Sequence, residues 1–164
     1  MYLTKNLGFT VIELIITIAI VSILLLITIP DMIFFVYNNR TTTAVNTIVS
    51  ALQFARSEAI NHKIKVKYCK SSNHKTCGGN WKDGQIVINE NGKILHVFAA
   101  LNYHDKLILN SSLGENEFVE FTNDGSTNGQ VGTFTYVPNG QKKYTRTIIV
   151  NHAGRVRVGK NNAS

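Results

Sequence analysis

Acidic residues are few in this chain of 164 residues, and none of them lies within residues 138–164. The chain has 17 Lys and Arg against 10 Asp and Glu, which gives a formal net charge of +7. The acid-free C-terminal segment carries these cations: Lys142, Lys143, Arg146, Arg155, Arg157 and Lys160. Unbalanced positive charge favours an anionic partner, such as nucleic acid or lipid head groups. A surface that only keeps the protein soluble is the alternative that charge leaves open.

Catalytic motifs are missing as well. The chain has no P-loop, no nucleophile elbow, no His-x-x-x-His pair and no paired carboxylates at catalytic spacing. Its histidines are scattered along the chain: His62, His74, His96, His104 and His152. We therefore expect no enzyme, no bound cofactor and no metal site.

Charged residues are nearly absent between Phe9 and Pro30, where Glu13 is the single ionisable side chain. A helix over this run would be about 30 Å long, which matches the hydrocarbon core of a bilayer. Lys5 lies on the short N-terminal side of the run, so the positive-inside bias predicts a cytoplasmic N-terminus. The sequence thus predicts a transmembrane helix over residues 9–30, with the remainder of the chain in the periplasm.

The residues before this run are not ordered as in a secretory signal peptide, whose small-residue cleavage site follows a shorter apolar segment. Here the small residue, Gly8, precedes the apolar run. A cut at Gly8 would fall on the cytoplasmic side and leave the apolar helix in the mature protein. Residues 1–8 are therefore predicted to be a cleaved leader.

Glu13 needs an explanation, because a carboxylate inside a spanning helix costs about 2.5–3.5 kcal/mol on insertion scales. One explanation is that its carboxylate reaches the membrane surface from near the end of the helix. The sharper one is that it neutralises a cationic group on a neighbouring subunit, such as a free N-terminal amine.

The cysteines number only two, Cys69 and Cys77. Disulfides form in the periplasm, and the short polar segment between the two residues can close into a loop. We expect a disulfide. A zinc site that adds His74 or His62 is the alternative, but the C-x7-C spacing matches no strong zinc pattern.

The hydrophobic pattern changes twice after Pro30. Apolar residues first recur at three- and four-residue spacing, which predicts an amphipathic helix over residues 31–62 packed on a sheet. The period then becomes two, with Lys63, Lys65 and Lys67 on the outer face of a first strand. Further strands are expected at residues 86–88, 94–98, 117–122, 131–137, 144–151 and 155–158. The predicted fold class is α+β: a long N-terminal helix packed on a small antiparallel β-sheet head, residues 63–164.

Residues 8–14 read G-F-T-V-I-E-L and resemble the class III leader of type IV prepilins and type II secretion pseudopilins. The resemblance implies that a prepilin peptidase cuts after Gly8 and methylates the new N-terminus at Phe9. It also implies that Glu13 pairs with the N-terminal amine of another pilin subunit during assembly at the inner membrane. Pro30 lies where many such helices have a proline, which fits a bend or a melted turn.

The wider layout resembles the GspH/FimT group of pilin-like proteins, and residues 154–157 read G-R-V-R. FimT-type minor pilins of naturally competent bacteria have a similar G-R-x-R stretch, which implies a role in binding DNA. In a strand, Arg155 and Arg157 would project from one face about 7 Å apart, while Val156 and Val158 would face the core. If residues 144–150 pair with this strand, Lys142, Lys143 and Arg146 come within reach. The alternative is an edge strand that its charges protect from aggregation.

The leading hypothesis is a minor type IV pilin that enters a pilus and binds extracellular DNA, without sequence preference, for uptake in natural transformation. The alternative is a structural minor pseudopilin of a type II secretion system. A third hypothesis is that the basic C-terminal segment binds anionic lipid near the membrane.

Overall fold

The computed structural model of the chain describes residues 8–111 and 118–159, apart from the side chains of residues 27–31. Lys160 and most of the predicted leader lie outside the described residues. The chain forms two compact units, Met1–Tyr37 and Asn38–Ser164, and each is described here by itself. We call the second the head unit.

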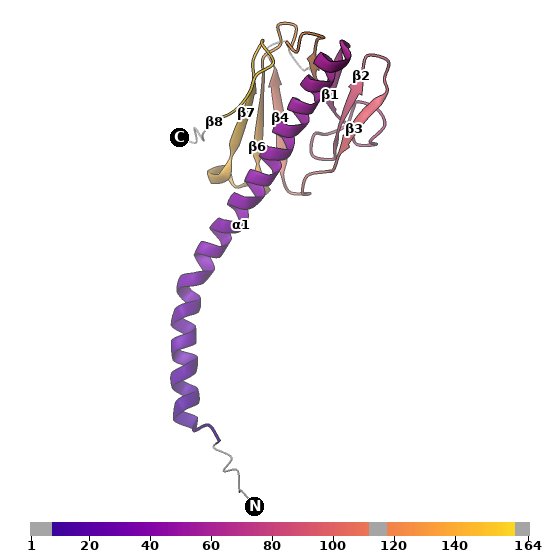
Figure 1. The fold of residues 1–164 in the computed structure, drawn as a ribbon. Coiled ribbons are helices and arrows are strands. Elements are labelled where there is room, and N and C mark those ends of the chain that lie inside the picture. Colours follow the sequence, from indigo (N-terminus) through magenta and orange to yellow (C-terminus); the bar gives the residue numbers. More distant parts are fainter. Residues whose placement is uncertain (1–7, 112–117, 160–164) are drawn as a thin grey trace, which may run out of the picture. The chain divides into compact units, whose positions relative to one another are not determined.

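Helix α1 (Val11–His62) is the first element of the chain (Figure 1). Its start is capped by Thr10, whose hydroxyl accepts a hydrogen bond from the N–H of Glu13 at 3.4 Å. The sequence Thr-x-x-Glu is therefore also a helix-start signal, and Glu13 lies in the first turn, where a carboxylate suits the helix dipole. The helix continues through Pro30, so the melted turn expected there is not formed.

The part of α1 that belongs to the first unit exposes its large apolar side chains. Phe9, just before the helix, and Leu26 are 79% and 76% exposed, and the large apolar residues between them are at least half exposed. This unit has no hydrophobic core among its described residues. Within the described part of the chain, no helix is long and apolar enough to cross a membrane.

The head unit contains two four-stranded sheets, where the sequence had predicted one. The first has the strand order β3-β2-β1-β5 and the second β4-β6-β7-β8, and all pairings are antiparallel. The bounds are β1 Val66–Lys70, β2 Gln85–Asn89, β3 Ile94–Phe98, β4 Lys106–Ser111, β5 Phe118–Phe121, β6 Gly132–Val137, β7 Arg146–Val150 and β8 Val156–Gly159. Two short 3-10 helices, η1 (Pro138–Gly140) and η2 (Lys142–Tyr144), connect β6 to β7.

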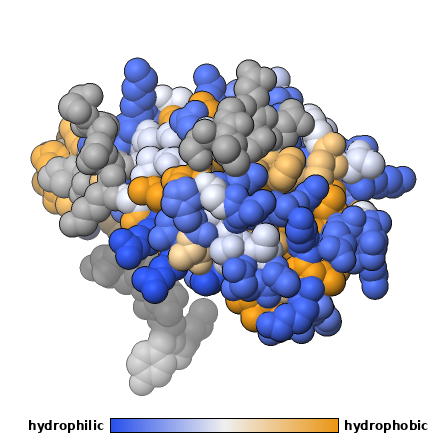
Figure 2. Space-filling model, turned by 90° about the horizontal axis from the view of Figure 1, so that it is seen from above, coloured by the Kyte–Doolittle hydropathy of each residue, from blue (hydrophilic) through white to orange (hydrophobic). Residues whose placement is uncertain are grey.

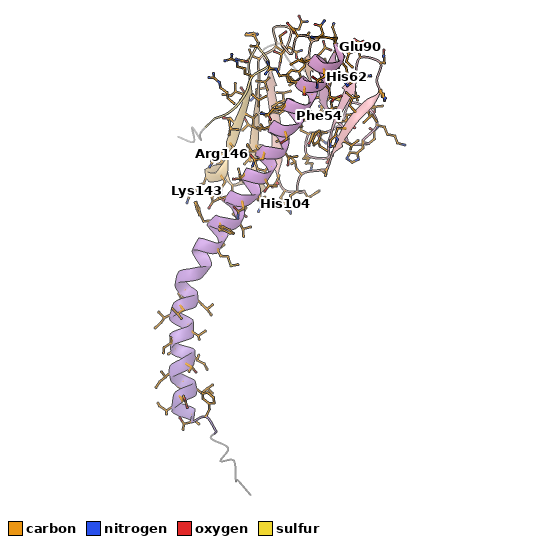
Figure 3. The ribbon with its side chains drawn as sticks, in the orientation of Figure 1. Phe54, His62, Glu90, His104, Lys143 and Arg146 are labelled. Atoms are coloured by element: carbon orange, nitrogen blue, oxygen red, sulfur yellow. A yellow bond between two sulfur atoms is a disulfide. The ribbon has the colours of Figure 1, made fainter. Side chains whose placement is uncertain are left out.

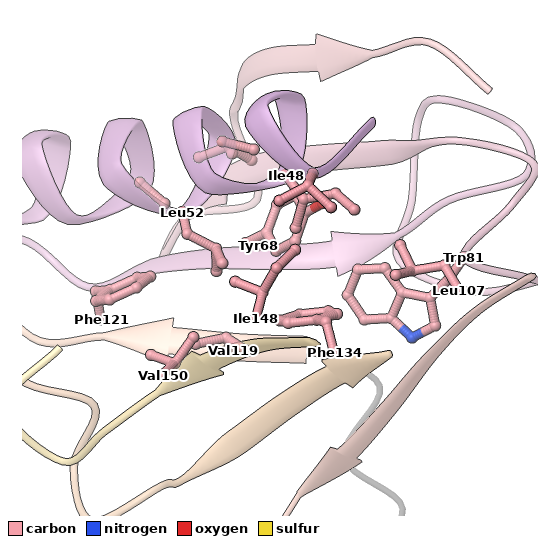
Figure 4. Packing of buried hydrophobic residues seen from close by; sticks show 14 of the residues in the cluster. Ile48, Leu52, Tyr68, Trp81, Leu107, Val119, Phe121, Phe134, Ile148 and Val150 are labelled. Atoms are coloured by element: carbon pink, nitrogen blue, oxygen red, sulfur yellow. The ribbon is translucent and has the colours of Figure 1, made fainter. Parts of the chain in front are cut away.

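The core of the head lies between α1 and the two sheets (Figure 4). On α1, the side chains of Ile48 and Leu52 are fully buried, as the predicted amphipathic pattern requires. Tyr68, Trp81 and Phe134 form an aromatic cluster, with ring centroids 5.1–5.9 Å apart. Burial raises the pKa of the Tyr68 hydroxyl far above its usual value. Within the head unit, α1 and both sheets therefore pack around one shared core.

Three strand predictions need correction. The first strand begins at Val66 and not at Lys63, because Lys63 adopts φ +55° directly after α1 and ends the helix in the left-handed conformation. Strand β4 was not predicted, because Leu107, Ile108 and Leu109 form an apolar run without alternation. The strand expected at residues 144–151 is formed only from Arg146 to Val150, because Tyr144 belongs to η2. The other predicted strands and the hairpin around Asn89–Gly92 are confirmed to within about a residue at their described ends.

The predicted disulfide between Cys69 and Cys77 is formed, with Cα atoms 5.6 Å apart. Cys69 is fully buried at the end of β1, so the bond ties the following loop to the sheet. Inside the loop, the Ser71 hydroxyl donates to the Thr76 carbonyl at 2.7 Å. The loop is therefore held both covalently and by hydrogen bonds.

Candidate nucleic-acid interface

The basic C-terminal segment forms the edge of the second sheet. Strand β8 pairs antiparallel with β7, and Arg157 lies opposite Ile149. The Arg155 carbonyl accepts a hydrogen bond from the Asn151 N–H at 3.1 Å. Arg155, directly before β8, and Arg157, within it, are both exposed. Residues two apart in an extended chain share a face about 7 Å apart, so the expectation for this pair stays a prediction.

The valines that alternate with these arginines differ from each other. Val156 lies opposite Val150 and packs against the core, as expected. Val158 was also expected in the core, but its side chain is 51% exposed. The reason is that β8 is an edge strand, so among the described residues Val158 has a neighbouring strand, β7, on one side only.

The tip of the β7–β8 hairpin is fixed by Arg56 of α1. Its Nε donates to the Gly125 carbonyl at 2.9 Å, and its Nη2 donates to the Ala153 carbonyl at 3.0 Å. One guanidinium thereby joins α1 to the loop after β5 and to the hairpin. Arg56 thus determines where the strand that carries the arginine pair begins.

Gly154 is the residue that permits this close approach. It is buried and has φ +68°, a conformation that residues with a Cβ rarely adopt. A Cβ at this position would overlap the carbonyl oxygen of Gly125 and lie near the Arg56 guanidinium. The glycine of G-R-V-R is therefore required by packing, and it places the two arginines that follow.

The same loop after β5 also contacts the hairpin through Thr127. Thr127 is fully buried, and its N–H donates to the His152 carbonyl at 3.0 Å. In the same loop, hydrogen bonds from the Thr122 hydroxyl and then the Ser126 N–H lower the pKa of Asp124 to about 2. Asp124 therefore stays ionised at neutral pH, next to Gly125, which contacts the hairpin tip. The arginine pair thus lies on a fixed support with a carboxylate in an adjoining loop.

Arg155 and Arg157 have no ion pair within the parts of the chain that the structure describes. Figure 2 views the molecule from above Figure 1 and shows a face on which hydrophilic residues predominate. Two exposed guanidinium groups on one strand, without carboxylate partners, are well suited to bind phosphate oxygens.

The other predicted members of the site lie elsewhere. Lys142 and Lys143 are in η2, and Arg146 begins β7, whereas Arg155 pairs at the end of β7. The five strand positions between Arg146 and Asn151 correspond to about 17 Å. Arg146 also lies opposite the buried Tyr136, so it is on the other face of the sheet from Arg157. The structure therefore does not bring the predicted basic residues together.

We call these two regions the distal and the proximal end of the head unit. The distal end contains the C-terminus of α1 at His62 and the hairpin tip that Arg56 fixes. The proximal end contains Arg40, where α1 enters the head unit, together with η2 and the start of β7. Figure 3 shows Lys143, Arg146 and His104 at one end of the head, and His62 and Glu90 at the other.

The lysines of the first strand are arranged differently from the prediction. Lys67 pairs with Glu120 at 3.4 Å and lies over the Phe118 ring at 4.8 Å, so its charge is compensated. Lys63 and Lys65 precede β1 and are exposed. Among the described residues, no three His, Cys, Asp or Glu side chains converge as metal ligands would.

Sequence reasoning missed Arg56 and Gly154 as residues that support the arginine pair. Gly154 had a visible signal, because it follows Asn-His-Ala in a turn between two strands. Arg56 had none, since its partners are 69 and 97 residues away in the chain.

Comparison with known proteins agrees with this fold. The family model for the type II transport protein GspH matches residues 44–154, and that for the prokaryotic N-terminal methylation motif matches residues 3–29. None of the curated proteins compared with the chain matches it. The chain is a pilin-like protein with an N-terminal methylation motif, of a family of non-enzymatic structural proteins. It belongs to the GspH family.

The solved structures that it resembles include the type IV minor pilin FimU of Pseudomonas aeruginosa strain PAO1, in two crystal forms. The P21 form is 21% identical, with a TM-score of 0.60 over 77% of this chain and 92% of FimU. The P65 form is 20% identical, with a TM-score of 0.54 over 73% and 92%. At this level of identity the likeness establishes the pilin fold.

Proposed function

We propose that this protein is a minor type IV pilin that enters a pilus and binds extracellular DNA for uptake in natural transformation. One observation carries the proposal: two exposed arginines lie at the sheet edge, Arg157 within the edge strand β8 and Arg155 directly before it. Their separation of about 7 Å suits successive phosphates of one DNA strand. Phosphate contacts carry no sequence information, so binding is independent of sequence.

The same arginines also protect an edge strand from pairing with other chains. That role requires only charge on the strand, and it does not require a fixed distance between two guanidinium groups. The glycine and the arginine that hold the hairpin tip, Gly154 and Arg56, support the DNA proposal because they fix the direction of the strand.

The N-terminal residues serve assembly in this proposal. A prepilin peptidase cuts after Gly8, Phe9 becomes the methylated N-terminus, and the apolar helix of residues 9–30 anchors the protein in the inner membrane. The exposed apolar side chains of this segment need a covering partner, either lipid or other pilin helices. Glu13 then pairs with the N-terminal amine of a neighbouring subunit.

A cleavage assay tests this part of the proposal. Gly8→Val should accumulate as an uncut precursor in mass spectra, because a branched side chain blocks the small-residue position at the cut. Glu13→Ala should be cut normally yet enter filaments poorly. Normal processing of Gly8→Val would argue against a class III leader.

A structural role in type II secretion is the second candidate, since the matching family is named for type II transport. Cells that carry Arg155→Gln with Arg157→Gln separate the two functions. The DNA-uptake proposal predicts loss of transformation with unchanged secretion. Normal transformation in the double variant, together with a secretion defect in a deletion strain, favours the pseudopilin.

A further inference from the structure

The proximal end of the head unit carries a second group of cations that DNA binding at the distal end does not use. We define the proximal basic surface by His104, Lys142, Lys143 and Arg146. All of these are exposed except Arg146, which is half-buried. They come from three segments, because β4 begins beside the end of β6, and β6 pairs with the start of β7.

A buried carboxylate holds these segments together. Asp105 is 2% exposed, and its oxygens accept hydrogen bonds from the Tyr136 hydroxyl at 2.7 Å and the Asn139 N–H at 3.0 Å. Nη2 of Arg40 lies 3.1 Å from the same carboxylate as an ion pair. The acidic group at this end is thus internal and already paired, which leaves the surrounding surface positive. Because Arg40 belongs to α1, the surface adjoins the point where α1 enters the head unit.

Aromatic side chains accompany the cations. Tyr103 is 78% exposed, the Lys82 ammonium lies 4.7 Å from its ring centroid, and the His104 ring lies 5.2 Å from it. In η2, the Lys143 ammonium lies 5.8 Å from the ring centroid of Tyr144. Tyrosine combined with long cationic side chains is the composition found where proteins meet a membrane surface.

The geometry points to anionic phospholipid head groups as the partner: we propose that the proximal basic surface binds the membrane in which the chain is anchored. This inference rests on the proposed anchor in residues 9–30. Only ten residues of sequence separate Pro30 from Arg40, so a short connection tethers this end of the head unit to the anchored segment. Anionic lipids attract Lys and Arg side chains that come within about a Debye length, roughly 10 Å, of the membrane surface.

Membrane lipid fits this surface better than DNA does. The two basic groups of the head lie at opposite ends of β7, and Arg146 and Arg157 are on opposite faces of the sheet. One duplex along the arginine pair would therefore not also follow η2. The lipid phosphodiester has the same chemistry as a DNA phosphate, so the experiment must separate the two sources.

The test uses the full chain in lipid nanodiscs with a fluorophore on Gln141→Cys, an exposed position next to η2. Lipids with a quencher on the head group report its approach to the membrane. We expect stronger quenching with phosphatidylglycerol than with phosphatidylcholine alone, and weaker quenching at high salt. A second fluorophore at Asn91→Cys, in the β2–β3 turn of the distal end, should show neither effect.

Matched charge variants locate the effect. Neutralising Lys142, Lys143 and Arg146 to Gln should weaken head-group binding, by roughly fivefold in the equilibrium constant for each cation at the membrane surface. Neutralising Lys63, Lys65 and Lys93, which also removes three cations, should leave it unchanged.

Equal quenching in the two lipids, or equal loss in the two triple variants, would overturn the inference while leaving the anchor intact. If added duplex DNA relieves the quenching of the fluorophore at position Gln141, the surface binds DNA, and the lipid inference is overturned as well. Failure of the full chain to enter nanodiscs would contradict the anchor itself, and the inference would fall with it.

Discussion

The two ends of the head unit present positive charge in different ways. At the distal end, Arg157 lies in β8 and Arg155 directly precedes it, after the hairpin tip that Gly154 and Arg56 hold. At the proximal end, the cations lie on short turns and strand starts that surround the buried Asp105. A strand fixes the distance between two charged residues, whereas turns bring charged residues together without fixing the distances between them. The distal end therefore suits a regular array of phosphates, and the proximal end suits a fluid membrane surface.

The comparison also shows why a count of charges does not define a site. The cations of residues 138–164 look like one cluster in the sequence. In the structure the described ones lie at the two opposite ends of strand β7 and are therefore separated. Strand parity then places Arg146 and Arg157 on different faces. Variants that damage one end and spare the other test this separation.

The largest effect is expected at the proximal end, from Asp105→Ala. The change leaves Arg40 and the Tyr136 hydroxyl without their buried partner, which should lower the free energy of unfolding by about 3–5 kcal/mol. Chemical denaturation of the head unit measures it. At a temperature where the variant is folded, DNA affinity should be unchanged, and a parallel loss of affinity would contradict the independence of the two ends.

The disulfide comes next. Replacing Cys69 and Cys77 with Ala should lower stability by about 2–3 kcal/mol, because the closed loop restricts the unfolded chain. Thermal unfolding with and without reductant measures the loss. The double variant should become insensitive to reductant, while a wild-type protein that already ignores reductant would show that packing alone holds the loop.

A matched pair of glycines compares the ends directly. Gly154→Ala should cost about 2 kcal/mol or more, because φ is +68° and the new Cβ meets the Gly125 carbonyl. Gly140→Ala, with φ +70° and open space around the Cβ, should cost only about 1 kcal/mol. Denaturation curves give both values, and DNA titration should show a loss for Gly154→Ala alone. Equal costs would mean that the distal contact is not tight.

The local features of the fold were predictable from sequence. The helix stripe with Ile48 and Leu52, the hairpin around Gly92 and the paired cysteines each depend on residues close together in the chain. Strand β4 was not predictable, because a short apolar run without alternation fits a helix or a strand equally well. The division into two sheets depends on long-range pairing that no local pattern records.

The candidate interface was predictable only in part. Arg155 and Arg157 are two residues apart on a strand, so their shared face follows from the sequence. The position of Arg146 depends on the register of β7 against β8, and a shift of one residue would move its side chain to the other face. The support from Arg56 required the structure, since its two acceptors are far away in sequence.

The salt dependence of DNA binding by the head unit, Asn38–Ser164, tests the central claim most directly. Two phosphate contacts from Arg155 and Arg157 should give log K against log salt a slope near −2 on duplex DNA. Replacing both with Gln should bring the slope close to zero with an unchanged thermal midpoint, because both side chains are exposed. Neutralising Lys65 and Lys93, an equal loss of charge, should leave the slope as it was. A slope that falls equally in both pairs, or falls only when Lys142, Lys143 and Arg146 are neutralised, would contradict the account.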